Sequence, residues 1–159
     1  TRLDWKAEVG GQQRKTTALE STLSLYKTIF DDYLTLANRT GMQSVFGDPY
    51  FYQHAQIGGE MSLRGFNSQR FTGKTAFYNN LDARIKLASF SSYLLPGTVG
   101  LIGFYDVGRV WMTNEKSDSW HMGAGGGFYF MPGDLMIIQA TVGASHEAVL
   151  PYIRIGLTF

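Results

Sequence analysis

The sequence contains no cysteine. That absence excludes disulfide bonds, catalysis by a thiolate and zinc sites built from cysteine ligands. The sequence also lacks a long apolar run, although 44 % of its 159 residues are hydrophobic, so a transmembrane helix is not expected. This does not exclude strands that span a membrane, because a barrel strand needs only about 9–11 residues and half of them can be polar.

Charge of one sign is not concentrated anywhere in the chain. The formal net charge is +1, and the basic residues are dispersed, with no run of five. This pattern gives no reason to expect binding to nucleic acid. The chain begins at Thr1, without an initiator methionine or an export signal. We therefore expect a mature segment, or a fragment whose export signal lies elsewhere.

Glycine and aromatic residues are abundant, in a pattern typical of β structure. Nineteen glycines and 14 % aromatic residues favour strands joined by tight turns over a helical bundle. Residues 151–159 show the pattern best, because successive side chains of a strand point to opposite faces and the apolar residues here fall on one of them. This apolar face consists of Ile153, Ile155, Leu157 and Phe159.

Nine stretches alternate in this way, at about residues 2–12, 18–30, 33–45, 50–59, 75–88, 98–111, 120–131, 135–145 and 151–159. A helical period of 3.6 residues would mix the polar and apolar sets. We therefore predict an all-β fold, an antiparallel transmembrane β-barrel whose apolar faces meet lipid. Single-chain barrels have even strand numbers, so nine strands, counted to within about one, cannot close a barrel alone and predict the C-terminal half of a larger one.

Three motifs stand out between residues 60 and 108. Leu63-Arg64-Gly65-Phe66 lies in the longest predicted connection, 60–73, and Phe104-Tyr105-Asp106-Val107-Gly108 lies on the sixth stretch. Between them, Gly73 is followed by Asn80-Leu81-Asp82-Ala83-Arg84. In this order and spacing, the motifs resemble the barrel of the outer-membrane assembly-factor superfamily (the bacterial surface antigen family), which includes BamA, TamA and the two-partner secretion transporters. The resemblance covers residues 50–159 best.

The resemblance implies a role for the loop motif. In that family the loop folds back into the barrel lumen, and its arginine meets an acidic residue in a Phe-x-Asp-x-Gly pattern. Carried over, Arg64 would pair with Asp106, two residues before Gly108. Gly65 would let the loop tip turn sharply, and Phe66 would anchor the loop against the wall. A guanidinium fork can hold a carboxylate with two hydrogen bonds, which suits such a pair.

The same resemblance places two more charged residues on a lumenal strand. Asp82 stands where the family has glutamate in a Leu-Glu-x-Arg pattern, and Arg84 matches its arginine. The replacement keeps the charge but shortens the reach of the side chain. Lumen-facing glycines within 123–127 would let side chains from elsewhere in the chain lie close to the wall.

A function follows from the resemblance as an expectation. The segment would belong to a sixteen-stranded barrel in the bacterial outer membrane that inserts or exports polypeptides. Its partners would be outer-membrane lipid, polypeptide substrates, the rest of the barrel and periplasmic domains upstream. The closing strand, with Arg154, Gly156 and Phe159, would pair with the first strand of the whole barrel. A poorly paired edge there can template a substrate strand.

Other interpretations stay open. The segment could be a passive membrane anchor or pore for an enzymatic or periplasmic domain upstream. A soluble eight-stranded, lipocalin-like barrel would show the same alternation with its faces reversed, but it leaves the motifs unexplained. Neither an enzyme nor a cofactor is expected in this chain, and no metal site, because the histidines lie on three separate stretches without ligand spacing. They are His54, His121 and His146.

Overall fold

The computed structural model describes residues 2–9, 16–30, 33–47, 49–91, 96–112, 119–133 and 135–157. Eight strands form one antiparallel sheet in the order β1-β2-β3-β6-β7-β8-β9-β10. Their bounds are β1 Arg2–Val9, β2 Thr16–Ile29, β3 Leu34–Gly47, β6 Thr75–Phe90, β7 Gly97–Trp111, β8 His121–Pro132, β9 Met136–Ala144 and β10 Val149–Leu157. The described part of the chain contains no helix long and apolar enough to cross a membrane.

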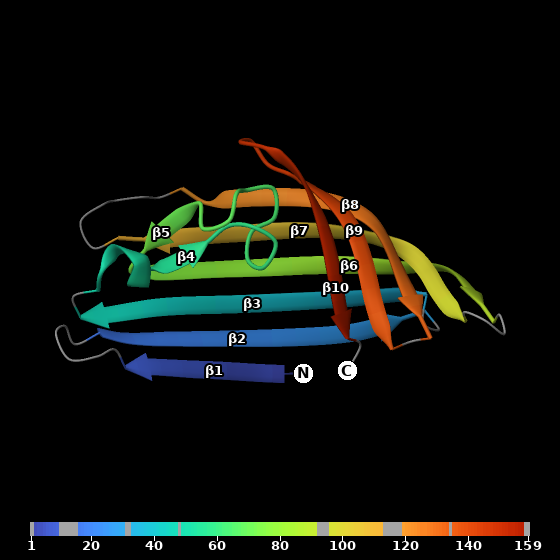
Figure 1. Ribbon diagram of the computed structural model, residues 1–159, viewed down its shortest axis with the longest axis horizontal. Coiled ribbons are helices and arrows are strands. Elements are labelled where there is room, and N and C mark those ends of the chain that lie inside the picture. Colours follow the sequence, from blue (N-terminus) through green and yellow to red (C-terminus); the bar gives the residue numbers. More distant parts are fainter. Residues whose placement is uncertain are drawn as a thin grey trace.

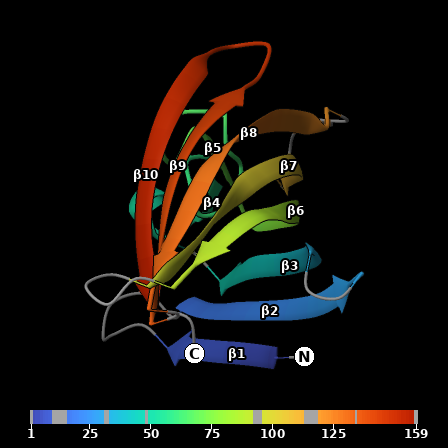
Figure 2. The same ribbon diagram turned by 90° about the vertical axis from the view of Figure 1, so that its right-hand side faces the viewer.

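The sheet is strongly curved and open. Figures 1 and 2 show that β9 and β10 are steeply inclined to β1–β3, and that the sheet curls round a concave face. Within the described residues, β1 pairs only with β2, and β10 pairs only with β9. The all-β, antiparallel fold is thus as predicted, and its open edges are those of part of a barrel.

The two faces of the sheet differ in chemistry as the alternation predicts. On the concave face, Asp106 and Asn80 make hydrogen bonds to the connection between β3 and β6. The convex face is mainly apolar, although polar side chains such as Lys27 of β2 also lie there. The cross-strand register places exposed side chains there, namely Leu19, Leu23, Leu25, Leu81, Ile85, Leu101, Met122, Phe128, Val142, Ile153 and Ile155. A lipocalin-like barrel would bury such side chains in its centre, so that alternative is wrong.

One of the nine predicted strands is not part of the wall. Residues 50–59 instead form a short 3-10 helix, Phe51–Gln53, and strand β4, Ala55–Ile57, which pairs with β5, Phe71–Gly73, in a separate two-stranded sheet. Ala55 and Ile57 are 3 % and 1 % exposed, because their side chains pack against the concave wall. Alternation alone cannot separate this arrangement from a lipid-facing strand. The wall has eight strands among the described residues, and the connection is longer than the predicted 60–73.

The connection between β3 and β6 packs on the concave face (Figure 2). Ile57, Leu63 and Phe66 are almost completely buried, against Tyr78 of β6 and Val110 of β7. Full burial of one such aliphatic or aromatic side chain contributes about 1.5–3 kcal/mol at most. The connection is therefore an internal plug with its own hydrophobic core, and it presents the Leu-Arg-Gly-Phe motif to strands β6–β10.

Candidate functional site

The centre of the site is the guanidinium group of Arg64. Its Nε donates to Oδ2 of Asp106 at 2.7 Å, and its Nη2 donates to Oδ1 of the same carboxylate at 2.6 Å. The backbone N–H of Arg64 also donates to Asp106 Oδ2, at 2.9 Å. Nη2 reaches Oδ1 of Asp82 at 2.6 Å as well. The pair expected from the motifs therefore forms, and the shorter Asp82 still reaches the arginine.

This ion pair is buried between the plug and the wall. The side chain of Asp106 is 0 % exposed and that of Arg64 is 9 % exposed. Burial alone would lower the pKa of Arg64, but the hydrogen bonds and charges of Asp106 and Asp82 outweigh it and raise the pKa above its usual value. The guanidinium carbon also lies 3.6 Å from the ring centroid of Phe104, an arrangement that favours a cation. Arg64 is thus held as a cation from three sides.

Gly65 joins the plug to the hairpin of β9 and β10. Its backbone N–H donates to the hydroxyl of Tyr152 at 2.8 Å, and its carbonyl accepts from Ser145 Oγ at 2.7 Å. Its φ is +90°, in the region that favours glycine. A Cβ on Gly65 would lie 2.8 Å from the carbonyl carbon of Ala144. Both the turn and the close approach therefore require glycine at this position.

Phe66 anchors the plug in an aromatic cluster. It is 0 % exposed and packs edge-on against Phe71, His121 and His146, at centroid distances of 5.2, 6.0 and 5.5 Å. The imidazole of His121 also stacks on Phe71 at 3.6 Å. Two of the three histidines thus pack against aromatic rings around the plug.

Glycines on the wall let the plug approach closely. A Cβ on Gly123 of β8 would overlap the carbonyl oxygen of Arg64, and one on Gly108 of β7 would lie 2.8 Å from Ile57 Cδ1. Gly125 leaves room for the ring of Phe104, whose Cζ would lie 2.6 Å from a Cβ there. Gly123 therefore lets the loop motif lie against β8, while Gly125 makes room for a side chain of the neighbouring strand, as expected for glycines that face the lumen.

A second tether holds the plug to the β9–β10 hairpin. Arg70 Nε donates to Oε2 of Glu147 at 2.8 Å, and Arg70 Nη2 donates to Oε1 at 3.2 Å. The hydrogen bond and the charge of Arg70 hold the pKa of Glu147 below its usual value, so this carboxylate is charged at neutral pH. The pair is exposed and screened by solvent, so its contribution to stability is small.

The family model of the Omp85 superfamily domain matches residues 1–149 of this chain. The chain belongs to the Omp85 superfamily. Its fold agrees with that assignment, since the family consists of outer-membrane β-barrel proteins that insert or transport proteins. No curated protein matches the chain.

Two of the three residues predicted for the closing strand lie on β10 of this Omp85 domain, namely Arg154 and Gly156. Arg154 faces the concave side, where its Nε lies 4.0 Å from Oε1 of Glu60 in the plug. Gly156 lies opposite Ile137 of β9. Phe159 is outside the described residues. Arg84 is near the site, with Nη2 3.9 Å from Oδ2 of Asp82.

Several residues of the site were not predicted from the sequence of this Omp85 domain. Tyr152 and Ser145 hold Gly65, and Asn80 Nδ2 donates to the carbonyl of Ser62 at 3.0 Å. Alternation places Tyr152 and Asn80 on the concave face, but it does not say which plug atoms they meet. Their partners lie on a plug whose path is set by tertiary packing.

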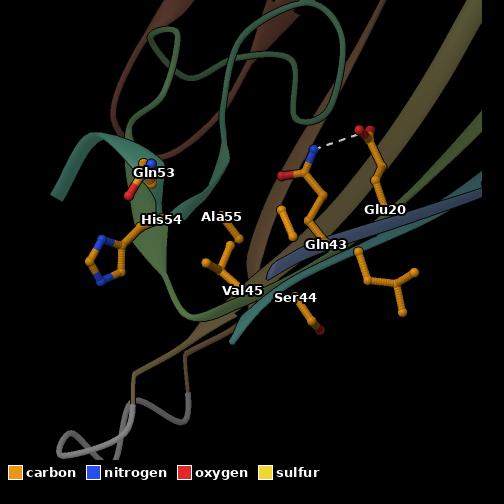
Figure 3. Close-up of a pocket in the computed structure, with 9 residues that line it drawn as sticks. Glu20, Gln43, Ser44, Val45, Gln53, His54 and Ala55 are labelled. Carbon is orange, nitrogen blue, oxygen red and sulfur yellow. Dashed lines mark hydrogen bonds between the residues drawn. The ribbon is translucent and has the colours of Figure 1, made fainter. Parts of the chain in front are cut away.

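A pocket of about 160 Å³ lies where the start of the plug meets β2 and β3 (Figure 3). Gln43 and Glu20 point toward each other in it, and Gln43 Nε2 donates to Glu20 Oε1 at 3.2 Å. Gln43 Oε1 accepts from the backbone N–H of Gln56 at 3.4 Å. These polar groups tie β4 to the wall, so the pocket is part of the attachment of the plug.

Removal of one hydroxyl group tests the contact between the plug and the hairpin. Tyr152→Phe leaves the buried N–H of Gly65 without its acceptor, and such an unsatisfied group costs about 1–3 kcal/mol. We expect faster hydrogen exchange at the Gly65 amide and an intact wall. Tyr105→Phe is the matched control, because the hydroxyl of Tyr105 lies on the convex face and contacts Met122 Sδ. Equal exchange rates at Gly65 in the wild type and in Tyr152→Phe would show that this hydrogen bond does not hold the loop.

Proposed function

We propose that this chain is the C-terminal half of a sixteen-stranded barrel in the bacterial outer membrane, and that the whole barrel inserts or exports polypeptides. Membership of the Omp85 superfamily supports this role in general terms. Eight wall strands with two open edges are the right number for half of such a barrel. The exposed apolar side chains of the convex face suit contact with lipid.

The observation that carries the proposal is the match to the Omp85 superfamily domain, and the strand we propose to meet the substrate is β10, which closes the whole barrel. Among the described residues β10 is hydrogen-bonded to β9 alone, and we propose that its pairing with the first strand of the barrel opens to expose this edge. An exposed edge presents unpaired N–H and C=O groups, to which an extended polypeptide can add as a further strand. Ile153 and Ile155 of this strand are 76 % and 69 % exposed on the convex face, where a substrate strand would meet lipid.

The plug argues against the alternative function of a passive, permanently open pore. It packs on the concave face and is joined there to β6, β7, β10 and the turn between β9 and β10 by the hydrogen bonds of Arg64 and Gly65. An open pore needs a water-filled lumen, whereas plugged barrels restrict the lumen. The plug therefore favours a barrel that handles polypeptides at a regulated site over a permanently open channel.

Photo-crosslinking in the full-length protein tests the role of the edge. A benzophenone amino acid replaces Ile155 on β10 or, as a matched control, Tyr105 on β7, which is also convex and 46 % exposed. The protein is reconstituted in vesicles and supplied with an unfolded outer-membrane protein. We expect crosslinks to this substrate from position 155 and far fewer from position 105. Equal crosslinking from both positions, or substrate insertion without any crosslink from 155, would contradict strand addition at this edge.

A further inference from the structure

A cavity of about 550 Å³ lies on the concave face between the plug and the wall. Residues from β2, β3, β6, β9 and β10 line it, together with Glu60, Met61 and Arg64 of the plug. It extends from the loop motif toward the end of the sheet where β8 turns into β9. Neither the ion pair at Arg64 nor the attachment of the plug accounts for its other charged groups.

The cavity carries more positive than negative charge. Its charged lining consists of four arginines and two carboxylates, namely Arg39, Arg64, Arg84, Arg154, Glu60 and Asp82. Asp106, which pairs with Arg64, adds a third carboxylate. Four guanidinium groups therefore face three carboxylates, and one positive charge is left over.

The guanidinium groups away from the loop motif are incompletely paired. Arg84 Nη2 lies 3.9 Å from Asp82 and Arg154 Nε lies 4.0 Å from Glu60, both too far for a hydrogen bond. Nη2 of Arg39 donates to the carbonyl oxygen of Met61 at 2.7 Å and to the hydroxyl of Tyr78 at 3.1 Å, while the Nε atoms of Arg39 and Arg84 are buried without a hydrogen-bond partner among the described residues. The side chains of Arg84 and Arg154 remain 27 % and 45 % exposed, so their guanidinium groups can donate to an acceptor that comes from outside the described residues.

Gly156 leaves space for such an acceptor. A Cβ at this position would meet only Cγ2 of Ile137, at 3.7 Å, so packing does not require glycine there. Gly143 on the neighbouring strand is different, because a Cβ there would lie 2.9 Å from the backbone N of Gly65. The missing side chain of Gly156 therefore enlarges the cavity beside Arg154.

We infer that this cavity binds a carboxylate carried by a polypeptide segment inside the barrel, with Arg84 and Arg154 as its main donors and Arg39 beside them. The planar fork of arginine matches a carboxylate with two parallel hydrogen bonds. The inference rests on the proposed function, because a polypeptide must reach the concave face. It adds a chemical preference to that function, namely acidic side chains or a C-terminal carboxylate.

Binding of a short fluorescein-labelled peptide to the full-length protein in detergent micelles tests the inference. The peptide carries one glutamate, and a second version carries glutamine in its place. We expect the glutamate peptide to bind about tenfold more tightly, which corresponds to about 1.4 kcal/mol. Arg84→Gln and Arg154→Gln should each reduce this preference. Gly156→Leu should weaken binding without changing the charge.

The control removes one positive charge from the other face. Lys27 is exposed on the convex side of β2, and Lys27→Gln should keep the full preference for glutamate. Equal binding of the two peptides would overturn the inference, and so would an equal loss in Lys27→Gln and Arg84→Gln. Stronger competition by inorganic phosphate than by acetate would assign the cavity to phosphate groups instead. A fall in barrel stability in Arg84→Gln with unchanged peptide binding would assign the carboxylate to the protein's own chain.

The peptide experiment and the crosslinking experiment test different claims, so a negative result in one does not decide the other. Crosslinks from position 155 with no preference for glutamate would reject the carboxylate site and leave the proposed function standing. A preference for glutamate without crosslinks from position 155 would reject strand addition at β10, while the cavity would still bind a carboxylate.

Discussion

Arg64→Ala is expected to release the plug from the wall while the eight-stranded sheet still forms. The substitution leaves the carboxylate of Asp106 buried and without its two guanidinium hydrogen bonds. Removal of one partner of a buried ion pair destabilises a protein by about 3–5 kcal/mol. The ladder hydrogen bonds of the wall do not involve this side chain. The plug should therefore become sensitive to protease, and polypeptide insertion should fall, while the strand signal in circular dichroism is unchanged.

Two further variants separate charge from geometry at this position. Arg64→Lys keeps the charge but loses the fork, so it should protect the plug only partly. Arg70→Ala is the matched control, because it removes an exposed, solvent-screened ion pair from the same segment and should have little effect on stability. Protease resistance and insertion equal to wild type in Arg64→Ala would show that the hydrophobic core of the plug is sufficient without the ion pair.

Gly123→Ala is expected to displace the loop motif by adding a single methyl group. The new Cβ would overlap the carbonyl oxygen of Arg64, and it would also lie 3.1 Å from the carbonyl carbon. Backbone atoms cannot rotate away as a side chain can. Overpacking of this kind costs about 1–3 kcal/mol. We expect a lower melting temperature of the plug and faster proteolysis between β3 and β6.

Gly103→Ala provides a close control for that experiment. Gly103 lies on β7, on the convex face, and a Cβ there would meet nothing within 4 Å. Alanine should be neutral or slightly stabilising at this position, because it restricts the unfolded chain. If Gly123→Ala were as harmless as Gly103→Ala, the plug would not depend on close contact with β8.

Much of the wall could be predicted from the sequence, because alternation is a local property. The apolar positions of residues 151–159 and the lumenal position of Asp106 both follow from a period of two. The same period misassigned residues 50–59, where Ala55 and Ile57 alternate with polar residues but face the plug core. Alternation shows that one face of a segment is apolar, but it does not show whether lipid or protein covers that face.

The ion pair and the hairpin contacts differ in how far they could be predicted. Arg64 and Asp106 lie in motifs of the family, so resemblance was sufficient to pair them. Tyr152 is 87 residues from Gly65, in a segment without a motif. Its hydroxyl meets the plug only because β10 curls round the concave face, and this curvature arises from the twist accumulated across the sheet.

The contact between Gly65 and Tyr152 also restricts how β10 can align with β9. A slip of one residue would turn the apolar face of β10 inward, and a slip of two would keep the faces but move each side chain by about 7 Å. Leu150 or Arg154 would then stand where Tyr152 stands now, and neither side chain can accept a hydrogen bond from the Gly65 amide. The plug therefore selects the register between β9 and β10, because the hydrogen bond from Gly65 to Tyr152 forms in the observed register and in neither slipped one.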